Sequence, residues 1–365
     1  MTRALELASY GLYTTYPNPA VGCVFVRDGK IIGEGYHHRA GEPHAEIMAL
    51  NAAGDVRGAT AYVSLEPCSH YGRTPPCALR LCQEHVARVV VASGDPNPKV
   101  SGRGIAMLRE AGIDVTEHVL EEQACYLNRA FFKGITKKQP YVTLKVGMSL
   151  DGKTALSDGR SKWITSAEAR LQVQDIRAKC DVIVTGSGTV QADDPRLNVR
   201  YGELPERVRD FLPEDKLRQP LKVVMDTRGR LDVEKYQIFS EGRVLWCTAG
   251  AEAFTEEILN EHVTRLYLPV APEGHLDFGA LLEYLGAREY RRVMVEAGAG
   301  LTATVVSSYA DELYVFMSPK ILGATARGAF AIDEVHDLDE ADRYMLHSVR
   351  TCGSDVRLHY LRHFI

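Results

Sequence analysis

Four residues in the first quarter of the chain could hold a metal ion and use it for chemistry. His44 and Glu46 are separated by one residue, and Cys68 and Cys77 follow them. One imidazole and two thiolates would give zinc three protein ligands and leave its fourth position to water, as is typical of a catalytic site. Zinc lowers the pKa of a bound water, so that hydroxide is available near neutral pH. Glu46, which is not needed as a ligand, could then carry protons.

The elements around these residues must bring them to one point. The apolar pattern predicts a helix over residues 44–53. Positions i and i+2 point to different sides of a helix, so His44 and Glu46 can face one metal only if His44 lies at its very start. Pro43 supports this placement. Cys77 follows two prolines and is expected in a first helical turn, where the helix dipole favours a thiolate.

The order of these residues narrows the interpretation. A single histidine or cysteine is more often a buried core residue than a ligand. However, H-x-E followed by P-C and a second cysteine resembles the signature of zinc-dependent nucleobase deaminases. That signature ends in P-C-x-x-C, whereas eight residues separate Cys68 from Cys77 here. Cys82 is the alternative second ligand, and it would be the fourth ligand if the zinc were purely structural.

The residues between the two cysteines make the resemblance more specific. Residues 65–77, LEPCSHYGRTPPC, resemble the deaminase domain of the bacterial bifunctional riboflavin-biosynthesis deaminase/reductase family. Three further segments resemble the same family: residues 17–22 (PNPAVG), 35–37 (GYH) with 40–46 (AGEPHAE), and 95–98 (DPNP).

The resemblance implies roles for the residues of the first half. Zinc would be bound by His44, Cys68 and Cys77, and Glu46 would be the proton shuttle. The substrate would be a pyrimidine ribonucleotide, 2,5-diamino-6-ribosylamino-4(3H)-pyrimidinone 5′-phosphate, and Asn18 would line its pocket. The resemblance also makes His70 and Arg73 candidates for contact with the base or the phosphate, whereas His37 and His38 are expected to be structural or surface residues.

The second half shows no G-x-G-x-x-G after a predicted strand, so a Rossmann site is not supported. Residues 298–300 (GAG) do follow a predicted strand and precede a helical pattern, and such a turn can bind a phosphate through backbone N–H groups. Residues 145–153, 161–165 and 185–195 resemble the riboflavin-pathway reductases. Those enzymes have a fold similar to that of dihydrofolate reductase and use NADPH.

The resemblance assigns two groups of contacts in this half. The nucleotide would be contacted by Gly147, Trp163, Thr189, Asp193, Thr227, Gly298, Ala299, Gly300, Leu301, Thr302, Ala303 and Thr304. The substrate would be contacted by Lys145, Ser161, Arg177, Leu197, Arg200 and Glu296. Asp151 is a further candidate for positioning the sugar. No arginine is clearly placed on a 2′-phosphate, so the residues do not decide between NADPH and NADH.

Strands and helices alternate along the chain after an initial β-hairpin, which predicts an α/β protein. We place a domain boundary at Pro140, because the residue before a proline is disfavoured in a helix. Residues 1–140 are expected to form a cytidine-deaminase-like α/β/α layered domain, and residues 141–365 an α/β domain like dihydrofolate reductase. A continuous helix is predicted over residues 121–138, and no pattern is evident in residues 331–365.

Composition and charge limit the alternatives. The 365 residues are 45% hydrophobic and 25% charged, as in an ordinary globular protein. Residues 1–140 carry a net charge of +1 and the remainder −6, so neither half has the basic excess expected of a nucleic-acid (tRNA) base deaminase, the main alternative. The eight scattered cysteines and the lack of a long apolar segment favour a cytoplasmic protein without membrane contact. We also expect a homo-oligomer.

Overall fold

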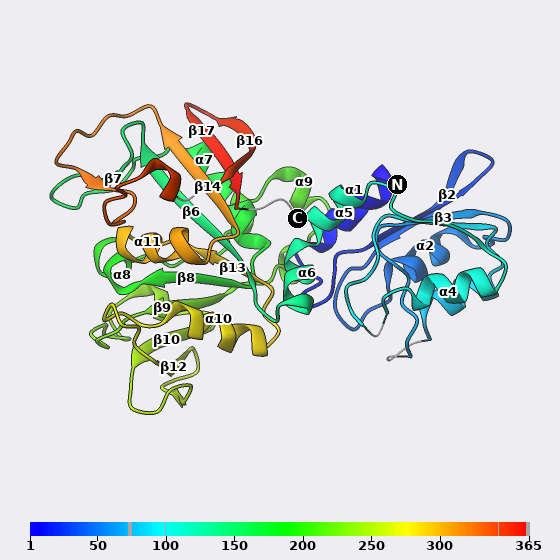
Figure 1. The fold of residues 1–365 in the computed structure, drawn as a ribbon, viewed down its shortest axis with the longest axis horizontal. Helices are drawn as coiled ribbons and strands as arrows, with labels where there is room; N and C mark the ends of the chain where they lie inside the picture. The colour runs from blue at the N-terminus through cyan, green and yellow to red at the C-terminus, as the bar shows by residue number, and fades with distance from the viewer. Residues whose placement is uncertain (72–74, 99, 342, 363–365) are drawn as a thin grey trace. The chain divides into compact units, whose positions relative to one another are not determined.

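The computed structural model describes residues 1–71, 75–98, 100–341 and 343–362. The chain divides into two compact units, Met1–Lys138 and a second that begins at Gln139 (Figure 1). None of the helices in the described ranges is long and apolar enough to cross a membrane.

The first unit is built on a five-stranded sheet with the order β2-β1-β3-β4-β5. β1 is antiparallel to β2 and β3, whereas β3, β4 and β5 are parallel. The strands are β1 (Gly22–Arg27), β2 (Lys30–Tyr36), β3 (Thr60–Val63), β4 (Arg88–Val91) and β5 (Asp114–Thr116). The helices are α1 (Thr2–Gly11), α2 (Ala45–Ala53), α3 (Cys77–Gln83), α4 (Arg103–Glu110), α5 (Glu121–Leu127) and α6 (Arg129–Thr136).

Alternate residues of β1 pack against helices on opposite faces of this sheet. Val24 packs against α1, whereas Cys23 and Phe25 join a cluster with residues of α2, α3 and α4. A Cβ atom at Gly35 of β2 would lie 2.6 Å from Ala49 N, so glycine allows α2 to approach the sheet closely. The first unit is therefore the α/β/α layered domain that the sequence predicts.

The second unit contains a ten-stranded sheet with the order β11-β12-β10-β9-β8-β13-β6-β14-β17-β16. The seven strands from β12 to β14 are parallel, and both edges are antiparallel. The strands are β6 (Tyr141–Ser149), β8 (Val182–Gly186), β9 (Leu221–Met225), β10 (Val244–Ala249), β11 (Glu256–Ile258), β12 (Val263–Leu268), β13 (Arg292–Val295), β14 (Glu312–Ser318), β16 (Met345–Cys352) and β17 (Asp355–Leu361). A separate small sheet pairs β7 (Lys153–Ala155) with β15 (Arg327–Gly328).

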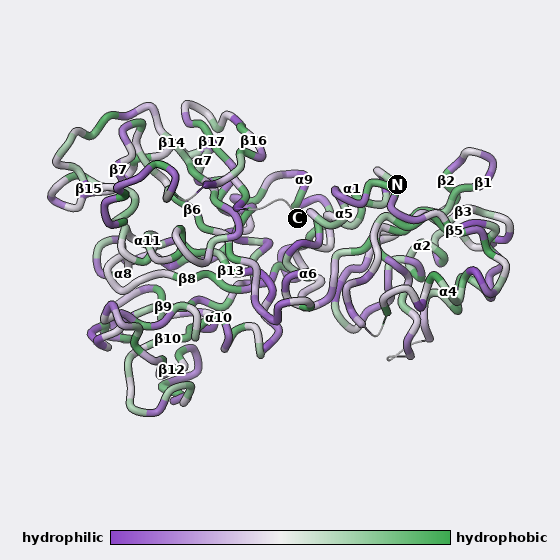
Figure 2. Tube along the Cα trace, viewed as in Figure 1, coloured by the Kyte–Doolittle hydropathy of each residue, from purple (hydrophilic) through white to green (hydrophobic). Residues whose placement is uncertain are grey.

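Helices cover both faces of the large sheet. Val182 and Val184 of β8 pack in a cluster with α10 and α11, and Ile183 packs on the other side with α7. Figure 2 shows hydrophobic residues along the central strands. The helices are α7 (Ala167–Ala178), α8 (Ser187–Asp193), α9 (Glu206–Arg209), α10 (Phe278–Ala287) and α11 (Ala299–Ser308).

One expectation about the elements was wrong, and one segment without an evident pattern contains two strands. The predicted helix over residues 121–138 is broken at Asn128, between α5 and α6. Asn128 is 2% exposed, and its side-chain amide donates to Ala20 O and accepts from Ala20 N, both at 2.9 Å. Within residues 331–365, where the sequence showed no pattern, β16 and β17 form a hairpin, and β17 pairs with β14. β17 is hard to recognise in the sequence because it contains polar residues at buried positions. One of them is His359, whose Nε2 lies 3.1 Å from Glu312 Oε2 on β14.

Candidate active sites of the two domains

The start of α2 places two of the four metal-site residues. His44 is the N-cap of this helix with extended backbone angles (φ −70°, ψ 166°), and Glu46 lies in the first turn. This confirms that His44 lies at the very start of the helix. Cys77 is the first residue of α3, as expected. His44 Nδ1 lies 3.6 Å from Cys68 Sγ and 3.4 Å from Cys77 Sγ.

The donor set fits zinc. The three ligand atoms all lie within 4.8 Å of one another. Zinc–nitrogen and zinc–sulfur bonds of about 2.0 and 2.3 Å in a tetrahedron would separate these atoms by about 3.6 Å. Cys82 lies outside the group, and its Sγ contacts Met107 O at 3.9 Å. Among the described residues the group therefore has three members, as in a catalytic site, and the structural-zinc alternative is not supported.

The charges of this group influence one another. Hydrogen bonds from Cys77 and His44 lower the pKa of Cys68 to about 4, and the partnership with Cys68 raises the pKa of Cys77. A bound zinc ion would favour the thiolate form of both. Burial, reinforced by the Cys68 thiolate, raises the pKa of Glu46 to about 7. The 4%-exposed carboxyl group of Glu46 is thus suited to accepting and returning a proton near neutral pH.

Asn18 contacts His37, whose ring lies beside the ring of His44. The His37 ring is 2% exposed and lies edge-on to the His44 ring at 5.3 Å. His37 Nδ1 lies 3.1 Å from Pro43 O and Nε2 lies 3.0 Å from Asn18 Nδ2. A neutral imidazole satisfies both contacts, since Nδ1–H donates and Nε2 accepts, and burial lowers the pKa of His37 accordingly. The Asn18 amide oxygen remains available as an acceptor.

Glu66 is a buried residue beside this site whose contacts the sequence reasoning missed. It is 4% exposed, and its carboxylate accepts hydrogen bonds from the backbone N–H groups of Gly102 and Gly104, both at 3.0 Å. These contacts fix the segment that leads to Cys68 against the start of α4. The available signal was an acidic residue at the end of an apolar strand, in L-E-P-C. His70 on the same loop is exposed, and Arg73 lies outside the described residues.

The second unit contains a cavity of about 1610 Å³, lined by the segments that follow its parallel strands. All but one of the predicted nucleotide contacts line it, and so do all the predicted substrate contacts of this half. Ala303 is the exception. Asp151 does not line it either, because its carboxylate accepts from Ser149 Oγ, Leu322 N and Gly323 N.

A buried charge cluster stands at one side of this cavity. Glu296 is 8% exposed, and its carboxylate lies 2.5 Å from Arg177 Nε and 3.4 Å from Lys145 Nζ. Burial alone would raise the pKa of Glu296, but Arg177 and Lys145 lower it to about 2. Arg200, predicted with Arg177 as a substrate contact, pairs with Glu203 at 2.7 Å on the surface.

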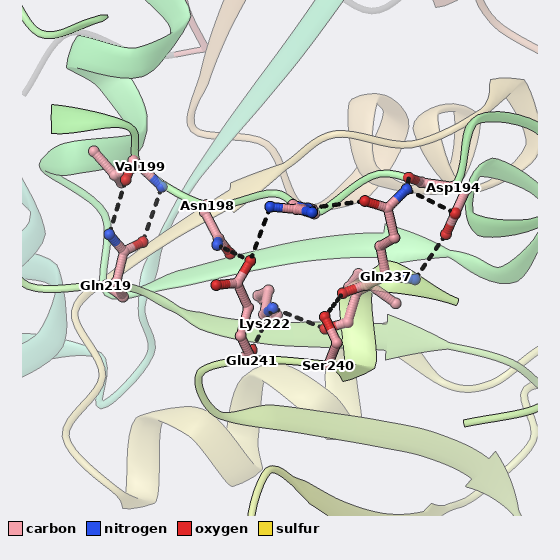
Figure 3. Close-up of polar contacts among 10 residues, drawn as sticks. Asp194, Asn198, Val199, Gln219, Lys222, Gln237, Ser240 and Glu241 are labelled. Atoms are coloured by element: carbon pink, nitrogen blue, oxygen red, sulfur yellow. Dashed lines mark hydrogen bonds and ion pairs between the residues drawn. The ribbon is translucent and has the colours of Figure 1, made fainter. Parts of the chain in front are cut away.

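Other contacts hold the cavity walls. Ser161 Oγ donates to Asp193 Oδ1 at 3.0 Å, and the Arg170 guanidinium lies 4.4 Å over the exposed Trp163 ring. The segment that carries Leu197 is fixed by a polar network that the sequence did not reveal (Figure 3). In it, Gln237 bonds Asp194 at 2.9 Å, Glu241 accepts from Asn198 at 2.6 Å, and Gln219 bonds Val199 N and O at 2.9 and 2.8 Å.

Fold and sites together define a protein that joins a zinc-binding deaminase domain to a reductase domain. Residues 1–93 match the family model described as the cytidine and deoxycytidylate deaminase zinc-binding region, and residues 140–358 match the model of the RibD C-terminal domain. The chain belongs to the RibD family of riboflavin-biosynthesis proteins. It is a bifunctional deaminase and reductase that uses zinc and NADPH.

Relatives match over the whole length. The riboflavin biosynthesis protein RibD of Escherichia coli is 46% identical, over 98% of this chain and 97% of its own. That of Haemophilus influenzae is 42% identical, over 99% and 96%. Among solved structures, Acinetobacter baumannii RibD has a TM-score of 0.88 at 41% identity. A deaminase/reductase from Thermotoga maritima has a TM-score of 0.86 at 36% identity, and both cover 99% of this chain and 97% of their own. These matches confirm the family resemblance and the fold class.

Proposed function

We propose that the first domain hydrolyses the exocyclic amine of 2,5-diamino-6-ribosylamino-4(3H)-pyrimidinone 5′-phosphate, and that the second domain reduces the ribosyl group of the product to ribityl. The Thermotoga maritima relative is titled a diaminohydroxyphosphoribosylaminopyrimidine deaminase and 5-amino-6-(5-phosphoribosylamino)uracil reductase. The observation that carries the proposal is the convergence of His44, Cys68 and Cys77 beside the buried Glu46, in a chain that also has the dinucleotide-sized cavity.

In the deaminase site, His44, Cys68 and Cys77 would hold zinc, which supplies an activated water when bound. Glu46 would carry the two protons of the attacking water, one to the ring nitrogen and one to the departing amine, so that ammonia leaves and oxygen takes its place. Asn18 orients the pyrimidine through its amide oxygen, because His37 fixes the amide nitrogen. Glu66 is a positioning residue, since it fixes the backbone before Cys68.

In the reductase site, the cofactor supplies the hydride, and the protein supplies position and charge. In the part of the chain that the structure describes, the N–H groups of the first turn of α11, from Ala299 to Leu301, have no hydrogen-bond partner, so they are suited to the pyrophosphate. We assign the substrate sugar to the side of the cavity with Lys145, Arg177 and Glu296, where a cation stands beside a fixed carboxylate. We assign deamination to residues 1–140 and reduction to residues 141–365. The nucleotide and substrate contacts of the reductase site are those that the family resemblance implies.

The partner is a small molecule. Homo-oligomer formation stays a prediction that light scattering of the purified protein can test. A cytoplasmic location stays a prediction that cell fractionation can test.

The test of the deaminase assignment is a Glu46→Gln variant. Glutamine keeps the size of the side chain but cannot carry a proton, so we expect deamination to fall by about 10²-fold or more while zinc content stays at one ion per chain. Glu42→Gln, on the exposed loop before α2, is the control and should keep the native rate. Normal turnover by the zinc-loaded Glu46→Gln protein would overturn the mechanism, and deamination of tRNA but not of the free nucleotide would overturn the substrate.

A further inference from the structure

We propose that Arg228 and Arg230, in the turn after β9, form the binding site for the 2′-phosphate of NADPH and so decide its preference over NADH. This inference rests on the proposed use of the cavity for a nicotinamide dinucleotide. The two cofactors differ by that one phosphate on the adenosine ribose, so the preference requires cations placed where this phosphate lies.

Both arginines line the cavity. In the ranges that the structure describes, their guanidinium groups have no hydrogen bond or ion pair, whereas Arg177 and Arg200 are paired with carboxylates. Two exposed guanidinium groups two residues apart repel each other unless an anion lies between them. A dianionic phosphate can accept several charge-assisted hydrogen bonds from such a pair.

The turn that carries them is held in one conformation. Asp226 is 3% exposed, and its Oδ2 accepts from Leu231 N at 3.0 Å and from Trp246 Nε1 at 3.3 Å. Gly229 N donates to Asp226 O at 3.0 Å, and Gly229 has a φ of +60°, which glycine adopts without strain. Thr227 Oγ1 accepts from Leu276 N at 3.3 Å. The arginines therefore project from a preorganised support.

Two of the three nearby carboxylates are already engaged within the protein, which leaves Glu273 as the alternative reader of an NADH ribose. An enzyme that prefers NADH reads the ribose diol with a carboxylate at the end of a strand. Asp226, which follows β9, is turned inward as described, and Asp277 accepts from Ala280 N as the N-cap of α10. Glu273 is the exposed carboxylate that lines the cavity on the facing segment, so it is the side chain through which a diol would be read.

The position fits the length of the cofactor. In the sheet, β9 is separated from β13 by β8, so the turn after β9 lies about 10 Å from the start of α11, which follows β13. A pyrophosphate at the start of α11 would place the adenosine ribose over β8 and its 2′-phosphate near the arginines. The nicotinamide would extend the other way, toward β6, which carries Lys145.

The experiment compares cofactor affinities by fluorescence titration of NADPH and NADH. The variants are Arg228→Gln, Arg230→Gln and the double variant, in the full-length protein. The double variant loses at least one charge-assisted hydrogen bond, each equivalent to about tenfold in affinity, so it should bind NADPH at least about tenfold more weakly. Its affinity for NADH should stay within about twofold, which also shows that the domain is folded. Adenosine 2′,5′-bisphosphate should compete with NADPH far better in the native protein than in the variant, and adenosine 5′-monophosphate equally in both.

The matched control is Arg243→Gln. Arg243 is also an exposed arginine, but it precedes β10, at the amino ends of the strands, and does not line the cavity. It should leave both affinities unchanged. An unchanged ratio of NADPH to NADH affinity in the double variant would overturn this inference and leave the proposed function intact. The same conclusion would follow if the native protein showed no preference for NADPH and Glu273→Gln lost affinity for NADH. A native protein that binds neither cofactor would overturn the proposed function itself.

Discussion

Replacing Glu296 with glutamine should destabilise the second domain by a definite and pH-dependent amount. The carboxylate of Glu296 is the counter-charge of Arg177 and Lys145, whose side chains are 14% and 21% exposed. The pKa of Glu296 is lowered from 4.5 to about 2. A difference of about 2.5 pKa units corresponds to about 3 kcal/mol in favour of the folded state when the group is ionised. Glutamine removes this term and leaves Arg177 buried without a counter-charge.

The pH dependence has a definite sign. Because the folded-state pKa lies below the unfolded one, the stabilisation is fully present above about pH 4.5–5 and is lost as the pH falls toward about 2. The difference in unfolding free energy between native and Glu296→Gln proteins should therefore be about 3 kcal/mol at pH 7 and shrink below pH 4.5.

The assay is urea unfolding followed by tryptophan fluorescence. Both tryptophans, Trp163 and Trp246, lie in the second domain, so the signal reports this domain alone. Glu203→Gln is the control, because its pair with Arg200 is 36% and 59% exposed and should contribute less than about 1 kcal/mol. A Glu296→Gln loss below about 1 kcal/mol at pH 7, with no change down to pH 4, would refute the reasoning.

Three further outcomes are expected in the first domain. Gly104→Ala should lower zinc content and deamination together, because its Cβ would lie 2.0 Å from Pro67 O and displace the segment before Cys68; metal analysis checks this. Asn128→Ala should cost about 2 kcal/mol by calorimetry, since both hydrogen bonds to Ala20 are lost. Chelation of zinc should abolish deamination but leave reduction of the already deaminated substrate unchanged, because the two sites lie in different units; an equal loss of both rates would contradict this.

The zinc site was predictable because its chemistry depends on residue types at short spacings. His44 and Glu46 are two positions apart, and a helix start is the one local geometry that lets both face a metal. Cys77 was placed by the prolines before it. Most element types were likewise predictable, because apolar periodicity and turn residues act locally.

What the sequence did not reveal depends on contacts between distant segments. Asn128 looks like one more helical residue until Ala20, far away in the chain, offers both of its backbone groups. Glu66 gains its role from the start of α4, and His359 can be buried only because Glu312 on the adjacent strand accepts its hydrogen bond. For Arg177, the resemblance implied a contact with the substrate, whereas the structure shows its guanidinium group already paired with Glu296.

The most direct test of the central claim is a two-stage mass measurement on the purified, zinc-loaded protein. With the diaminopyrimidinone ribonucleotide alone, we expect a product whose mass differs by about +1 Da, as NH is exchanged for O. Addition of NADPH should then give a further change of about +2 Da, as two hydrogens are added. A mass that stays unchanged in the first stage, or a deaminated product that NADPH leaves unaltered, would contradict the assignment of both reactions to this one chain.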